Sequence, residues 1–151
     1  MHLYCCCFFL PPLFRLEKGS APLVSVAAHM TKSICYQNKD ALMAGIIIAG
    51  WDKSKGAQVY SIPLGGTLVE QDVAIGGSGS TFIYGLIDAE YKNDMTAEQC
   101  LAFVRKAISH AMARDGSSGG VIRTAVITEA GVERGFVPGD ALPFAFLADT
   151  E

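Results

Sequence analysis

Two long stretches of the chain carry apolar residues at the three-and-four spacing of an amphipathic helix. The first covers residues 22–42, where Pro22 suits a first helical turn. The second begins at Thr96, which forms a capping box with Gln99, and we expect it to end at Gly116 in the left-handed conformation. The apolar positions are Leu23, Val26, Ala27, Met30, Ile34 and Cys35 in the first helix and Leu101, Val104, Ile108 and Met112 in the second.

The other periodic segments predict strands and one short helix. Residues 44–52 form an Ile-rich run typical of a buried strand, and residues 58–64 and 67–75 follow as two further strands joined by a glycine turn. Residues 82–91 have a short helical spacing, and residues 121–134 predict a strand, a turn and a returning strand. This order predicts an α+β fold in which helices cover an antiparallel sheet.

Composition agrees with one globular domain. The chain has 151 residues, of which 50% are hydrophobic and 18% are charged. The formal net charge is −3, and the scattered Lys and Arg residues form no basic stripe, which argues against nucleic-acid partners and anionic membranes. We expect no nucleic-acid and no membrane partner.

Cysteine spacing gives no metal site and no disulfide framework. Cys5, Cys6 and Cys7 are contiguous, whereas Cys35 and Cys100 lie singly in helical patterns. The odd total of five argues against full pairing. We therefore expect a reducing compartment and buried thiols.

The two ends of the sequence differ from its middle. Residues 1–21 form an apolar, Cys-rich leader whose apolar run is too short to span a bilayer. A signal-peptide core is one interpretation, but no Lys or Arg precedes the run, so an alternative start joined to a normal domain is the favoured one. Residues 136–151 carry Pro138 and Pro143 and are expected to form an irregular, partner-facing tail.

Two Ser/Gly loops are the candidates for chemistry: GGSGST at 76–81 and DGSSGG at 115–120. Glycine-rich backbone and serine hydroxyls suit an oxyanion or a phosphate. The first loop lacks the lysine of a phosphate-binding loop, and Phe82 stands where the dinucleotide motif needs glycine, so nucleotide binding is disfavoured. A serine nucleophile at Ser78 or Ser118 would need a base, and no histidine lies in either loop.

Asp115 stands at the C-terminal end of the second long helix, where a carboxylate is unfavourable by about 0.3 to 1 kcal/mol. One interpretation is structural: the side chain closes a turn by accepting from the amides of Ser117 or Ser118. The other is functional: Asp115 faces a cationic group in a site. The residues alone leave both open.

Three segments resemble the beta subunits of the 20S proteasome, most closely the beta-one (caspase-like) group and its interferon-inducible counterpart. They are AGWDKSKGAQVYSIPLGG at 49–66, AIGGSGSTFIYGLIDAEYK at 74–92 and MARDGSSGGVIRTAVITEAGVERG at 112–135. The resemblance covers about residues 22–144. It implies the αββα sandwich of the N-terminal-nucleophile hydrolases, assembly with other proteasome alpha and beta subunits, and a cytoplasmic and nuclear location.

The resemblance also implies a chemistry. In that family a threonine at the mature N-terminus attacks the peptide carbonyl, and its own α-amino group accepts the proton; no cofactor or metal takes part. Ser78, Asp115 and Ser118 match the supporting positions, and the amide of Gly77 or Ser78 is expected near the oxyanion. The functional interpretation of Asp115 is then the favoured one.

The family's first strands, with its nucleophilic threonine, have no counterpart in this sequence. Thr67 follows two glycines but does not match the mature start, and cleavage there would discard half the sheet. We therefore expect residues 22–151 to be an incomplete beta-type domain, a truncated form, without peptidase activity by itself. The alternatives are a non-catalytic binding or assembly module in a beta-ring position, and an independent serine or nucleotide enzyme that uses residues 76–81.

Overall fold

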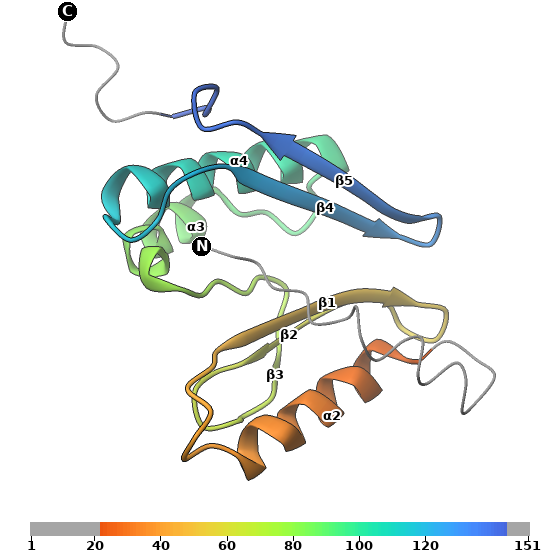
Figure 1. Ribbon diagram of the computed structural model, residues 1–151. Coiled ribbons are helices and arrows are strands. Elements are labelled where there is room, and N and C mark those ends of the chain that lie inside the picture. Colours follow the sequence, from red (N-terminus) through yellow and green to blue (C-terminus); the bar gives the residue numbers. More distant parts are fainter. Residues whose placement is uncertain (1–21, 145–151) are drawn as a thin grey trace, which may run out of the picture. The chain divides into compact units, whose positions relative to one another are not determined.

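The computed structural model describes residues 22–144, which divide into two compact units (Figure 1). One unit contains residues 22–75 and 127–131, and the other contains residues 76–126 and 132–144. The leader prediction for residues 1–21 and the last seven residues of the predicted tail lie outside the described range. The mixture of helices and antiparallel strands confirms the α+β class and is consistent with the N-terminal-nucleophile hydrolase fold.

The first unit packs one helix on a three-stranded sheet. Helix α2 (Val24–Gln37) lies along β1 (Ile46–Asp52) and β2 (Gly56–Ile62), and β3 (Val69–Glu70) completes the antiparallel order β1-β2-β3 (Figure 1). The β1–β2 register runs from Ile46 opposite Ile62 to Asp52 opposite Gly56. Helix and sheet enclose the buried side chains of Val24, Ala28, Cys35, Ile48, Tyr60 and Ile62.

Gly66 closes the turn between β2 and β3 where only glycine fits. Its φ is +81°, and a Cβ there would lie 2.7 Å from the backbone nitrogen of Tyr36. The sheet turn can therefore approach the last turn of α2 closely because position 66 has no side chain. The glycine turn expected from the sequence is confirmed.

The second unit is built around a long helix. The 3₁₀ turn η2 (Ser78–Phe82) leads into α3 (Tyr84–Glu90), and α4 (Ala97–Arg114) follows. Most of strands β4 (Ile122–Thr128) and β5 (Gly131–Val137) belongs to this unit, and the two strands form a separate two-stranded sheet. Helix α4 contacts both η2 and α3, and its buried side chains include Phe103, Ala107, Ile108 and Ala111.

Several details of the predicted elements are wrong. The first helix covers Val24–Gln37 instead of residues 22–42, and Pro22 precedes its N-cap, Leu23. Strand β3 covers only Val69–Glu70 instead of residues 67–75, because its pairing with β2 is confined to two positions. Helix α4 ends at Arg114, and its C-cap Asp115 is extended, with φ −92° and ψ 113°; Gly116 does not have positive φ. Cys100 is exposed because it lies in the solvent-facing first turns of α4, although Cys35 is buried as expected. The predicted irregular tail begins after Val137, since Phe136 and Val137 still belong to β5.

Candidate functional site

The site is built from the end of α4 and from the loop that precedes η2. The N-terminus of α4 has the capping box that the sequence predicts: Thr96 Oγ1 accepts from the Gln99 amide at 3.2 Å, and Gln99 Oε1 accepts from the Thr96 amide at 2.9 Å. These bonds define where the helix starts. The helix is 18 residues long, and Asp115 is the residue that directly follows its last turn. The Asp115 amide still donates to Ala111 O at 2.8 Å, so its backbone is fixed by the helix.

One carboxylate oxygen of Asp115 joins both Ser/Gly loops. Ser78 Oγ and Ser118 Oγ each donate to Asp115 Oδ2, both at 2.6 Å. The Ser117 amide donates to the other oxygen, Oδ1, at 3.2 Å. Three donors from two loops therefore hold the carboxylate at a helix end that would otherwise disfavour it.

These hydrogen bonds lower the pKa of Asp115 below its ordinary value. The donation from Ser118 contributes most, followed by that from Ser78 and then by the Ser117 amide, while partial burial opposes them. Asp115 is buried, Ser118 is half-buried and Ser78 is exposed. The carboxylate is thus kept ionised beneath two serine hydroxyls, one of which faces solvent.

The structure brings together all three site residues that the sequence analysis singled out. It also shows the turn closure that was the competing interpretation, because the Ser117 amide bonds Asp115 Oδ1 and the Ser118 amide bonds Asp115 O at 3.0 Å. The two interpretations are compatible. The turn fixes the backbone, and the bond from Ser78, 37 residues away in the chain, is the contact that a turn alone does not require.

Neither described histidine is bonded to a serine of the cluster. His29, exposed on α2, has Nδ1 at 2.8 Å from Ser25 O. His110, on α4, packs against Phe144 with ring centroids 3.9 Å apart, and its pKa is lowered, chiefly by burial. Among residues 22–144 the two serines therefore share a carboxylate without a histidine base, and no group of side chains there could hold a metal ion.

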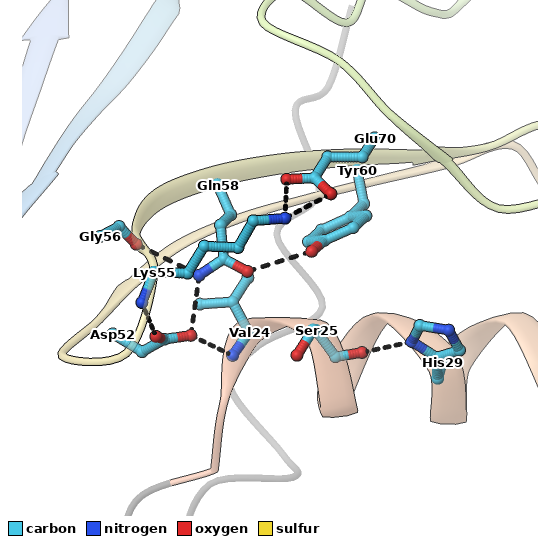
Figure 2. A network of polar contacts seen from close by, with 9 residues as sticks. All are labelled: Val24, Ser25, His29, Asp52, Lys55, Gly56, Gln58, Tyr60 and Glu70. Atoms are coloured by element: carbon cyan, nitrogen blue, oxygen red, sulfur yellow. Dashed lines mark hydrogen bonds and ion pairs between the residues drawn. The ribbon is translucent and has the colours of Figure 1, made fainter.

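Sequence reasoning missed a second buried carboxylate, Asp52, at the end of β1 (Figure 2). Its Oδ2 accepts from the Val24 amide at 3.0 Å and from Gln58 Nε2 at 2.8 Å. Its Oδ1 accepts from the amides of Ser54 and Lys55, and Tyr60 extends the network by donating to Gln58 Oε1 at 3.0 Å. These bonds, the Val24 amide foremost, hold the pKa of Asp52 well below its usual range.

The Asp52 network holds the helix on the sheet in the first unit. Asp52 tethers the first residue of α2 to the β1–β2 hairpin, and the exposed ion pair of Lys55 with Glu70 ties that hairpin to β3 (Figure 2). The sequence analysis placed Asp52 only at the end of the predicted strand 44–52. The partner amide of Val24 lies 28 residues away, so no local pattern signals it.

Comparison with known proteins places the chain in a family. The proteasome subunit family matches residues 12–127, more than half of the chain. The known proteins to which this chain is similar are named as proteasome beta subunits. The chain belongs to the proteasome beta subunit family. The resemblance seen in the sequence is thereby confirmed.

Three relatives show the extent of the similarity. The chain is 55% identical over 128 residues to the proteasome subunit beta type-6-A like protein of Salmo salar. The aligned region covers 85% of this chain and 59% of that protein. It is 55% identical over 127 residues to proteasome subunit beta type-6 of Dictyostelium discoideum, covering 84% and 59%. It is 50% identical over 131 residues to proteasome subunit beta type-9 of Mus platythrix, covering 87% and 59%.

The chain therefore spans about three-fifths of the length of these proteasome relatives. The family match includes residues 12–21, and the boundary at residue 21 between leader and domain stays a prediction. In the part of the chain that the structure describes, the helices are each too short or too polar to cross a membrane.

Proposed function

We propose that this chain assembles as a beta-type subunit of the 20S proteasome core, with other alpha and beta subunits, and takes part in ubiquitin-dependent protein breakdown in the cytoplasm and nucleus. Family membership supports this proposal, together with relatives at 50% to 55% identity that are named as proteasome beta subunits. Because the chain spans only 59% of the length of the Salmo salar relative, assembly is the first property to test.

We further propose that Ser78, Asp115 and Ser118 are the supporting part of a threonine-type hydrolytic site for peptides. The observation that carries this proposal is the sharing of Asp115 Oδ2 by two hydroxyls from separate loops. Such an arrangement fixes two hydroxyl dipoles and one negative charge, and a fixed negative charge favours a protonated amine close to it. A threonine α-amino group, which must gain a proton during acyl transfer, is suited to that environment.

The cluster is not a hydrolase by itself. Activation of a serine hydroxyl requires a nearby base, and the described residues bonded to Ser78 and Ser118 supply only the carboxylate of Asp115, whose pKa is lowered. A carboxylate of low pKa is a weak proton acceptor at neutral pH. We propose that the chain of 151 residues has no peptidase activity when tested alone.

A non-catalytic module in a beta-ring position is the second candidate. It is favoured by large apolar side chains that are exposed at the N-cap of α2 (Leu23) and on α2 itself (Met30 and Ile34), since a solvent-facing apolar helix side is typical of a subunit contact.

Mass spectrometry of purified 20S particles tests the proposal. We expect peptides from residues 22–144 in the particle. A threonine-started N-terminus joined to these residues would supply the nucleophile that the cluster supports, whereas the leader sequence inside the particle would indicate the non-catalytic module. Absence of peptides from residues 22–144 from the particle would overturn assembly. In parallel, fluorogenic peptides should not be hydrolysed by the isolated chain, and hydrolysis that is lost in Ser78→Ala would instead indicate an independent serine enzyme.

A further inference from the structure

Gly79 lies between the two serine loops, at the point where η2 meets α4. It is a buried residue of η2, directly after Ser78. A Cβ built on its backbone would lie 2.9 Å from Ser118 Oγ, 3.1 Å from Ala111 Cβ and 3.4 Å from Asp115 Oδ2. Its φ is not in the left-handed region, so the backbone conformation itself is open to any residue. What demands glycine here is space.

The two nearest neighbours of Gly79, Ser118 and Ala111, differ in how they can respond to a side chain. Ser118 could rotate its hydroxyl away, but it would then give up its 2.6 Å bond to Asp115. Ala111 is fully buried in α4, and its Cβ cannot move without the helix. If η2 moves away instead, Ser78 moves with it and leaves Asp115 Oδ2. Both the rotation of Ser118 and the displacement of η2 therefore separate a serine from the carboxylate.

We propose that Gly79 is a positioning residue for the cluster: its missing side chain, set against the small Ala111, allows the hydroxyls of Ser78 and Ser118 to reach one oxygen of Asp115. This inference rests on the proposed function of the cluster and adds a fourth residue to it. Gly79 touches no reacting atom and acts through the two serines.

Gly79→Ala in the full chain tests the proposal, with Gly119→Ala as the matched control. Gly119 lies in the other Ser/Gly loop, next to Ser118. It has no atom within 4 Å of a built Cβ and does not have positive φ. The readout is the ¹³C NMR titration of the Asp115 carboxyl. We expect its midpoint to rise toward the ordinary value in Gly79→Ala and to stay unchanged in Gly119→Ala, since the serine donations that lower it are the bonds at stake. An unchanged midpoint in folded Gly79→Ala would overturn the proposal.

A double variant keeps the test decisive if Gly79→Ala does not fold. Ser118→Ala removes the atom nearest to the added methyl. Adding Gly79→Ala to Ser118→Ala should then lower the thermal midpoint much less than adding it to the parent chain. Equal losses in the two backgrounds would contradict a role that acts through Ser118. Mass spectrometry of particles tests the proposed function separately, because absence from the particle would leave the NMR result on the isolated chain unaffected.

Discussion

At the scale of single residues, Asp115 shows how one side chain can serve both local folding and a site. Its bonds to Ser117 and Ser118 are local, and they follow from the tendency of Asp to close turns at helix ends. Its bond to Ser78 crosses 37 residues. The sequence could predict the first kind from residue type, whereas only the family resemblance placed Ser78 beside Asp115, because no periodicity brings separate loops together.

Asp115→Asn should destabilise the chain in a manner that depends on pH. The hydrogen bonds lower the folded-state pKa of Asp115, so its stabilising contribution is fully present above the unfolded pKa of about 3.9 and is lost as pH falls through the lower folded pKa. Urea unfolding of the parent and the variant should therefore differ at neutral pH and converge in acid. Asp72→Asn, at an exposed carboxylate, is the control and should show a small difference at every pH. A gap for Asp115→Asn that does not close in acid would contradict this origin.

At the scale of helices and strands, the starts of elements were easier to predict than their ends. The capping box at Thr96 is a local code that specifies the first turn of α4, and the structure confirms it. The end of α4 at Asp115 and the short β3 depend on contacts from other segments: the cluster in one case and pairing with β2 in the other. The residue types at Gly116 and at residues 71–75 therefore do not predict where α4 and β3 end.

Thr96→Ala removes the side-chain oxygen that accepts from Gln99 N and should destabilise the chain by about 1 kcal/mol. Thr67→Ala is the matched control, because Thr67 is exposed and lies outside any helix. Chemical unfolding followed by far-UV circular dichroism measures both. Equal stability of the Thr96 and Thr67 variants would show that the capping box does not contribute.

Asp52→Ala should loosen α2 from its sheet. The change leaves the Val24 amide and the Gln58 side chain without their acceptor, and the loss of charged hydrogen bonds in a buried position predicts a destabilisation of about 2 to 4 kcal/mol. Hydrogen exchange should become faster at the amides of the first turns of α2. Asp72→Ala, at an exposed position, should leave those amides unchanged. Slow exchange retained in Asp52→Ala would show that apolar packing alone holds the helix.

At the scale of the whole molecule, the order of periodic segments was sufficient for the α+β class, and the segments that resemble proteasome beta subunits were sufficient for the family. The composition was not specific to either, since a half-hydrophobic chain of this length suits many domains. The Asp52 network was beyond prediction at this scale too, because it depends on the docking of α2 against a hairpin that begins nine residues after that helix ends.

The central claim is that this chain is a subunit of a proteasome particle, and sedimentation of the tagged chain in a gradient of cell lysate tests it most directly. We predict that the chain migrates with the particle, together with alpha and beta subunits, and that Gly119→Ala does the same. Migration of the tagged chain only at the position of a free polypeptide of about its own 16.0 kDa, while the particle is intact in the same gradient, would contradict the account.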